Sequence, residues 1–342
     1  MQRLVFFILL VALIGGGVYV YVNFDFAVKR DQDGKFQYLM MTPKGTVSPA
    51  DLPGGGPGGL PPATARSVIR IATFNVTRLD EKKLDNHRVA DVLVHLLPRF
   101  EIVALQDIRA RNQGVLVRLV DQINKATGQN YRFAVGRDFA RDPAAQYGAF
   151  LFDSASIEID HALANAVEDP TGGFRNRPLV ASFRVRGPSK EEAFTFKLVN
   201  VHVDRTRASA ELDLLDDVYR TLRDGGSQEG GSREDDVIVL GDFGADDQNL
   251  GQLGQVLDIT SAIVATPTTL RAAGPVDNIL FDRQASCEFT GRAEVLDLMR
   301  EFDLTMRQTL EVSDHLPVWA EFNALEGGRL GHMAAETGRT TR

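Results

Sequence analysis

The apolar positions divide the chain into a hydrophobic N-terminal stretch, a segment rich in proline and glycine, and a long region of short apolar runs. Residues 4–22 are apolar apart from glycines and two tyrosines, and Arg3 precedes them. As a helix this stretch would be about 28 Å long, close to the thickness of a bilayer's hydrocarbon core. We therefore expect residues 1–24 to form a signal anchor or signal peptide; a buried core helix is the alternative.

The charges around this segment do not set its orientation, because Lys29, Arg30 and Lys35 follow it. The glycines at 15–17 offer a cleavage point, but no A-x-A site follows them. We favour an uncleaved membrane anchor that holds the rest of the chain in an extracytoplasmic position. Secretion after cleavage is the alternative.

Proline and glycine dominate the next part of the chain. Residues 49–65 are PADLPGGGPGGLPPATA, a composition that does not sustain a regular element. We expect residues 25–66 to be a linker. No apolar periodicity is sustained after residue 324, which predicts a flexible tail over residues 325–342. The folded domain is therefore expected over residues 67–324.

Short apolar runs alternate with helical patterns inside this domain. The spacing of apolar residues predicts helices over residues 88–97, 114–126 and 208–222. The runs typical of buried strands are VIRIATFNV (68–76), EIVALQDI (101–108), AFLFD (149–153), FKLVNVHV (196–203), DVIVLGDF (236–243), VDNILF (276–281) and LPVWAEF (316–322). Strands flanked by helices throughout predict a layered α/β domain. The mixed charges at residues 80–83 predict a solvated loop.

Composition and charge exclude some kinds of site and binding partner but do not identify a particular partner. Of 342 residues, 44% are hydrophobic and 25% charged, the values of an ordinary globular protein. The single cysteine, Cys287, excludes an internal disulfide framework and a multi-cysteine zinc site. A net charge of −8 gives no overall basic surface of the kind that nucleic-acid-binding proteins often carry. A local arginine patch and a bound cation are still able to attract a polyanion. No feature indicates an obligate protein partner.

Polar side chains recur where the apolar strands begin or end. These residues are Asn75, Asp107, His202, Asp242, Asp277, Asp314 and His315. A carboxylate beside a buried strand costs several kcal/mol unless it is paired or binds metal. Their recurrence at equivalent places predicts one polar centre at the rim of the sheets, where α/β folds build their sites.

The residue types of this centre favour phosphoester hydrolysis. Asparagine and carboxylate oxygens are hard ligands suited to Mg²⁺ or Ca²⁺, and such an ion neutralises phosphate charge. Two histidines supply an acid and a base near neutral pH. The sequence contains no G-x-S-x-G elbow, so acyl transfer is the weaker interpretation.

At this point the sequence resembles a known family. The motifs ATFNV, EIVALQDI, LVNVHVD, VIVLGDFGAD, VDNILFD and VSDHLPV resemble, in order, those of the endonuclease/exonuclease/phosphatase superfamily. They cover almost all of residues 68–322, and the nearest branch is that of deoxyribonuclease I. The resemblance implies a four-layer α-β-β-α sandwich with two mixed β-sheets, preceded here by the N-terminal hydrophobic helix.

The resemblance also implies the residues of the reaction. The divalent cation, Mg²⁺ with Ca²⁺ or Mn²⁺ as alternatives, would be held by Asn75, Asp107 and Asp314. The catalytic group would consist of the acid/base pair and its orienting carboxylates, His202, His315, Asp242 and Asp277. Substrate would be bound by Arg175, Arg177 and Asn278, with the two arginines close to the position of the branch's phosphate-binding arginine.

Three positions depart from the family pattern. Asp107 stands where the family has a glutamate, so the carboxylate is withdrawn by one methylene. Gly244 replaces the asparagine that normally follows GDF, and Gln146 stands where a glutamate would support His202. Removal of a donor near developing charge typically costs about two to three powers of ten in rate.

The sequence thus predicts a divalent-metal-dependent phosphodiester hydrolase, with DNA as the expected substrate and an activity weakened by these departures. The alternatives are a phosphatase or sphingomyelinase-like lipid phosphodiesterase, which the membrane segment favours, and a binding module of the same fold that has lost turnover.

Overall fold

The computed structural model describes residues 24–30, 36–43, 66–110, 112–136, 146–224, 235–271 and 274–327. The chain divides into two compact units, Met1–Gly58 and Gly59–Arg342. The expected anchor helix and C-terminal tail lie almost wholly outside the described residues, and none of the helices within the described ranges has the length and apolar character needed to cross a bilayer.

The first unit contains a two-stranded antiparallel sheet. Strand β1 (Phe24–Arg30) pairs with β2 (Phe36–Pro43), with a register shift between Lys29 and Arg30. This differs from the prediction of a linker over all of residues 25–66. In FDFAVKR the large apolar residues Phe24, Phe26 and Val28 fall at every second position, the period of a strand. The proline and glycine content of the following residues had outweighed this signal.

The second unit is built on two six-stranded mixed sheets. The strands of the first sheet, in spatial order, are β11 (Ile259–Ser261), β12 (Asp277–Asp282), β10 (Val237–Asp242), β9 (Thr195–His202), β8 (Leu179–Val185) and β7 (Ile157–Ala166). Those of the second sheet are β13 (Phe289–Val295), β14 (Val318–Asn323), β3 (Val68–Leu79), β4 (Ile102–Ile108), β6 (Tyr147–Asp153) and β5 (Tyr131–Val135). Among the strand pairs of the described residues, β9–β10 and β3–β4 are parallel and the others are antiparallel.

The inner faces of the two sheets share one apolar core. Phe183 of the first sheet meets Phe150 of the second edge to face, with ring centroids 5.3 Å apart. Phe281 and Phe322 make a similar contact across the sheets at 5.6 Å. Burial of these rings removes a large apolar area from water and fixes how the sheets face each other.

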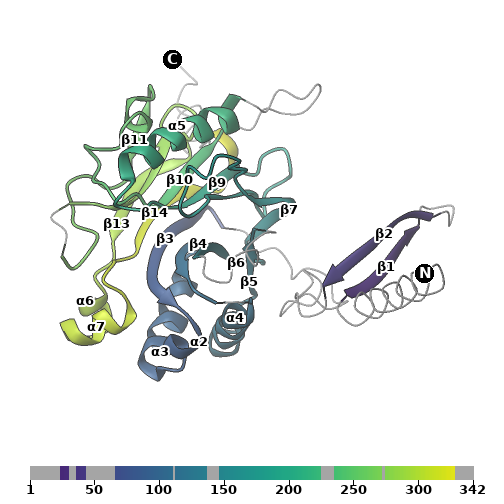
Figure 1. Ribbon diagram of the computed structural model, residues 1–342, viewed down its shortest axis with the longest axis horizontal. Helices are drawn as coiled ribbons and strands as arrows, with labels where there is room; N and C mark the ends of the chain where they lie inside the picture. Colours follow the sequence, from purple (N-terminus) through teal and green to yellow (C-terminus); the bar gives the residue numbers. More distant parts are fainter. Residues whose placement is uncertain are drawn as a thin grey trace, which may run out of the picture. The chain divides into compact units, whose positions relative to one another are not determined.

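Helices cover the outer faces (Figure 1). Helix α5 (Ala208–Asp224) packs Leu212, Leu215 and Tyr219 against the outer side of the first sheet. The helices on the side of the second sheet are α2 (Glu81–Leu84), α3 (His87–Leu96), α4 (Gly114–Thr127), α6 (Leu298–Glu301) and α7 (Met306–Val312). Short 3-10 turns at Leu97–Arg99 and Leu253–Gln255 complete the elements. The predicted α-β-β-α sandwich is confirmed.

Strand register aligns the polar residues at one rim. His202, the last residue of β9, is paired with Asp242, the last residue of β10. Asp242 is paired in turn with Asp277, the first residue of the antiparallel β12. In the other sheet, Asn75 of β3 pairs with Gln106 of β4, next to Asp107. Backbone pairing therefore places these side chains at a common edge.

Candidate active site

A pocket of about 390 Å³ opens at this rim. The predicted site residues that line it are Asn75, Asp107, Arg175, His202, Asp242, Asp314 and His315. They come from strands of both sheets and from the loops that precede β8 and β14. The pocket wall is mostly polar, and its volume suits a small charged group better than a large apolar ligand.

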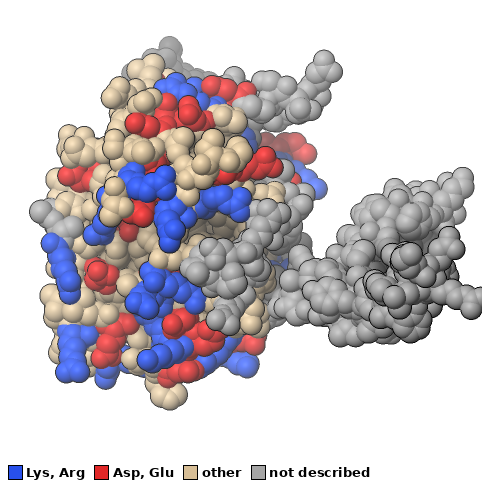
Figure 2. All heavy atoms as spheres, in the orientation of Figure 1, with Lys and Arg blue, Asp and Glu red and all other residues tan. Residues whose placement is uncertain are grey.

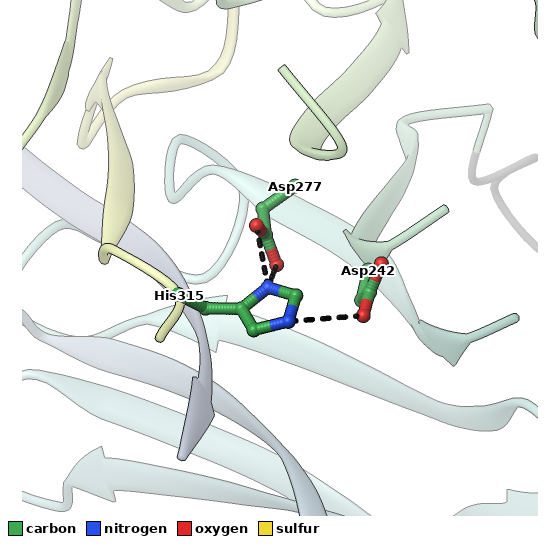
Figure 3. Close-up of side chains that lie close together, drawn as sticks. All are labelled: Asp242, Asp277 and His315. Carbon is green, nitrogen blue, oxygen red and sulfur yellow. Dashed lines mark hydrogen bonds and ion pairs between the residues drawn. The ribbon is translucent and has the colours of Figure 1, made fainter. Parts of the chain in front are cut away.

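His315 is held between two carboxylates (Figure 3). Its Nδ1 lies 2.8 and 3.0 Å from the two carboxylate oxygens of Asp277, and its Nε2 lies 3.6 Å from Asp242 Oδ2. Asp277 is fully buried behind the ring and also accepts a 2.9 Å hydrogen bond from the Thr268 hydroxyl. Burial lowers the pKa of His315, but the neighbouring carboxylates outweigh it and raise that pKa to about 9. His315 is therefore protonated at neutral pH.

His202 has a different environment. Its Nε2 lies 3.9 Å from Asp242 Oδ2, and its buried Nδ1 has no hydrogen-bond partner among the described residues. Burial lowers the pKa of His202 below 6.5 in spite of the charges of Asp242 and Asp107. His202 is therefore neutral at pH 7. Gln146 lines the same pocket, in the place where the family pattern has a supporting glutamate.

Asp242 connects the two histidines. Its Oδ1 accepts the backbone N–H of Gly244 at 2.9 Å, and its Oδ2 accepts the side-chain amide of Asn75 at 3.0 Å. The same Oδ2 faces both imidazoles. The arrangement holds one charged and one neutral imidazole on the two sides of a single carboxylate, which is what combined acid and base catalysis needs.

Strand β3 bulges where it enters the pocket. Thr77 and Arg78 have φ of 42° and 60°, and Asp107 on the adjacent strand has φ of 58°. Thr77 N donates to Asn75 Oδ1 at 3.0 Å, and the Thr77 hydroxyl donates to Asp314 Oδ1 at 2.8 Å. Such left-handed conformations in non-glycine residues store strain and concentrate at functional sites.

The donor set of the pocket fits a divalent cation. Amide and carboxylate oxygens of Asn75, Asp107 and Asp314 are the hard ligands that Mg²⁺ and Ca²⁺ prefer. Ligand atoms of Asp242, Asp277 and His315 also lie within 4.8 Å of one another, close enough to hold an ion. In that second group the His315 Nδ1 is engaged with Asp277 (Figure 3), so we assign it to histidine orientation. The pocket is a possible metal site.

Some of the arginines near the pocket line it and others do not. Arg109, Arg175 and Arg205 line it and are exposed. Arg177 is not among the lining residues, and neither is Asn278. Asn278 is buried, with its side chain exchanging hydrogen bonds with the backbone of Ile263 at 3.0 and 2.8 Å. The structure thus gives Asn278 a structural contact where substrate binding was predicted.

The comparisons with known proteins agree with this geometry. No family model matches the chain. The chain is 26% identical to Deoxyribonuclease-1-like 2 of Mus musculus over 273 residues, 75% of this chain and 92% of the relative. It is 25% identical to Deoxyribonuclease-1 of Sus scrofa over 280 residues, 73% and 90% of the two chains. Deoxyribonuclease-1-like 1 of Rattus norvegicus is 29% identical over 272 residues, 76% and 83%.

Solved structures share the fold at low identity. A humanized D. rerio TDP2 has a TM-score of 0.53 at 16% identity, covering 75% of this chain and 100% of the other. An endonuclease/exonuclease/phosphatase family protein from Bacteroides thetaiotaomicron has a TM-score of 0.51 at 14% identity, covering 75% and 97%. The chain is therefore similar in sequence to deoxyribonucleases of the deoxyribonuclease I type, and it shares the fold of endonuclease/exonuclease/phosphatase proteins.

Two residues at the pocket were not predicted from the sequence. Glu211 of α5 is buried, and its carboxylate accepts the backbone N–H of Arg175 at 2.9 Å and of Asp204 at 3.1 Å. It thereby ties together two loops on the pocket wall. Its only signal in the sequence is a carboxylate directly beside the apolar positions of the helix.

Lys83 is the second unpredicted residue. The charged run at 80–83 was expected to be a solvated loop, but it enters helix α2, and Lys83 is partly buried. Its Nζ donates to the carbonyls of Val76 and Thr77 in the β3 bulge, at 2.6 and 2.5 Å. Burial lowers the pKa of Lys83 to about 8. A basic side chain thus supports the bulge that presents Asn75.

The charge pattern of the surface agrees with the sequence. In the face shown in Figure 2, Lys and Arg side chains form several groups with Asp and Glu side chains between them. This face carries no continuous basic area. Any attraction of a polyanion therefore depends on the arginines around the pocket.

Proposed function

We propose that this protein is a divalent-metal-dependent phosphodiester hydrolase that acts as a DNA endonuclease. The observation that carries the proposal is the pair of histidines that face Asp242 in one pocket with hard oxygen donors, of which only His315 is also held by Asp277. Support for the substrate comes from the relatives that are named deoxyribonucleases. A neighbouring structure, of D. rerio TDP2 with a TM-score of 0.51, is described as complexed with single-strand DNA product.

The pocket residues divide the work of hydrolysis. His202, neutral at pH 7, accepts a proton from the attacking water at Nε2. His315, protonated through its contact with Asp277, donates a proton from Nε2 to the leaving oxygen. Asp242 lies close to the Nε2 atoms of both rings and stabilises whichever ring is charged. Arg175 and Arg205 attract and position the phosphate.

A divalent cation fits the remaining donors of the pocket. Asn75, Asp107 and Asp314 would hold it, with Mg²⁺ as the first choice and Ca²⁺ or Mn²⁺ as alternatives. When bound, such an ion neutralises phosphate charge and stabilises the additional negative charge of the transition state.

A lipid phosphodiester is the second candidate substrate. The apolar run at residues 4–22 favours it, because a membrane anchor would hold the pocket near phospholipid headgroups. We propose the same segment as the anchor of an extracytoplasmic domain. A binding module without turnover is the third possibility, and the pairing of Asp107 with Arg109 favours it because that carboxylate is already neutralised.

A plasmid-nicking assay on the full-length chain tests the proposal. We expect nicking with Mg²⁺, Ca²⁺ or Mn²⁺, none with chelator, and a loss of at least about 100-fold in His202→Ala and in His315→Ala. The matched control is His95→Ala, because His95 is an exposed histidine of α3 that does not line the pocket.

The outcomes separate the candidates. Cleavage of sphingomyelin or another phospholipid without cleavage of DNA would replace the nuclease with the lipid enzyme. No divalent-dependent cleavage of DNA, RNA or lipid phosphodiesters would leave the binding module.

A further inference from the structure

Both carboxylate oxygens of Asp107 are already occupied by protein donors. Arg109 Nε lies 2.6 Å from Oδ1, and Arg109 Nη2 lies 3.3 Å from Oδ2. The backbone N–H of Arg78 donates to Oδ2 at 2.8 Å. Asp107 is 5% exposed, so its negative charge needs a compensating partner, and the guanidinium supplies it.

The two hydrogen-bond partners of Asp107 differ in how easily they can move away from its carboxylate. Arg78 N belongs to the bulge of β3, which Lys83 fixes from beneath. The backbone of Arg109 is also fixed, because its N–H donates to Leu79 O at 2.8 Å. Its side chain, however, is 38% exposed and lines the open pocket. The guanidinium is therefore the partner that is free to move.

We propose that Arg109 is an internal competitor of the divalent cation: guanidinium and metal ion exclude each other at Asp107. The inference rests on the proposed function, which gives Asp107 to the cation. The physical reason is that three protein donors already take up most of the lone pairs of this carboxylate, and that the guanidinium and the metal ion repel each other at short distance. The shorter aspartate strengthens the effect, since it keeps the carboxylate deep in the strand, where the guanidinium already meets it.

The proposal predicts that removal of Arg109 strengthens metal binding. Mn²⁺ binding to the full-length protein in detergent is measured by titration calorimetry for the wild type and for Arg109→Gln. We expect the dissociation constant to fall about fivefold in Arg109→Gln, the size of an exposed ion pair expressed as a binding ratio. Arg109→Lys, which keeps the charge but loses the two-point contact, should lie between them.

Arg118→Gln is the matched control. Arg118 makes a similar ion pair with Asp85, at 2.6 Å and with 43% of its side chain exposed, but it does not line the pocket. The substitution removes the same charge from the protein, so it should leave Mn²⁺ binding unchanged. A fivefold effect in this control as well would assign the gain to net charge and overturn the proposal.

Asp107→Asn separates this inference from the proposed function. Loss of Mn²⁺ binding in Asp107→Asn, together with unchanged or weaker binding in Arg109→Gln, would overturn the competition and leave the metal site in place. Mn²⁺ binding that does not respond to Asp107→Asn would overturn both, because the cation would then lie elsewhere.

Discussion

At the scale of single residues, His202 and His315 differ in what their ring nitrogens contact. Asp277 lies 2.8 Å from His315 Nδ1, whereas His202 Nδ1 is buried without a hydrogen-bond partner among the described residues. The same ring type thus has a pKa of about 9 in one place and below 6.5 in the other. Neighbouring carboxylates and burial, rather than the residue type, assign the acid and the base.

These two pKa values predict a bell-shaped dependence of rate on pH. The rate should rise as pH rises through the lowered pKa of His202, because only the neutral ring accepts a proton. It should fall as pH rises through about 9, because His315 then loses the proton that it donates. Initial cleavage rates from pH 5 to about 10.5 measure both limbs.

Asp277→Asn tests the assignment of the alkaline limb. Without the carboxylate that raises the pKa of His315, the descending limb should move to lower pH by at least about one unit. An unchanged limb in this variant would contradict the assignment.

Gly244 stands where the family pattern has an asparagine, so a substitution at this position restores the missing side-chain amide. Its φ of +62° lies in the left-handed region, which glycine and asparagine tolerate best. An added Cβ would lie 3.1 Å from Arg205 Cγ, in a flexible side chain that is able to shift. Gly244→Asn should therefore fold and raise the cleavage rate by about tenfold or more, since a single well-placed donor contributes up to about 100- to 1000-fold.

Gly244→Ala is the matched control for this change. It adds the same Cβ without an amide, and its backbone strain in the left-handed region is at least as large, so it should not raise the rate. Equal rates in Gly244→Asn and Gly244→Ala would mean that the missing amide does not limit catalysis.

At the scale of elements, the register between β9 and β10 sets the geometry of the site, and Gly241 makes that register possible. With φ of +147°, a Cβ at this position would lie 2.0 Å from the carbonyl oxygen of Val201 on the neighbouring strand. The glycine of the GDF motif is therefore required by strand packing, and the pairing of His202 with Asp242 depends on it.

Gly241→Ala should destabilise the fold strongly. The clash involves backbone on both sides, so relief requires the strands to separate, and we expect a loss of about 3 kcal/mol or more in the free energy of unfolding. Denaturant titration measures it. The control is Gly128→Ala at the end of α4, where φ is +70° and nothing lies within 4 Å; only conformational strain of about 1 kcal/mol is expected there. Similar losses in the two variants would contradict the steric explanation.

At the scale of the whole molecule, the pocket exists because two sheets meet at one rim. Asn75 and Asp242 are 167 positions apart in sequence, yet their side chains are 3.0 Å apart. The Ser313 hydroxyl donates to Asn75 O at 2.7 Å across 238 positions. The shared apolar core between the sheets holds these contacts in place, so damage to that core is expected to disturb the site as well.

Strands β13 and β7 were not predicted from the sequence, and their residues show why. Strand β13 is only partly buried: Phe289, Ala293 and Val295 pack against the apolar core, but Gly291, Arg292 and Glu294 between them are exposed. Strand β7 pairs irregularly with β8, with a register shift between Asp160 and Asn165. Edge strands of this kind are stabilised by their neighbours more than by their own residues, so local composition carries little sign of them.

The sequence by itself determined most of the buried strands, three of the covering helices and the polar residues that would meet at the strand ends, because burial imposes a periodic apolar pattern on each element. It also identified the departures at Asp107, Gly244 and Gln146. It did not predict β8, an interior strand in which buried and half-buried residues alternate. Only the tertiary structure decided which polar groups neutralise one another. The pairing of Arg109 with Asp107, the anchoring by Glu211, the support by Lys83 and the opposite charge states of the two histidines arise from contacts and burial that no local pattern encodes.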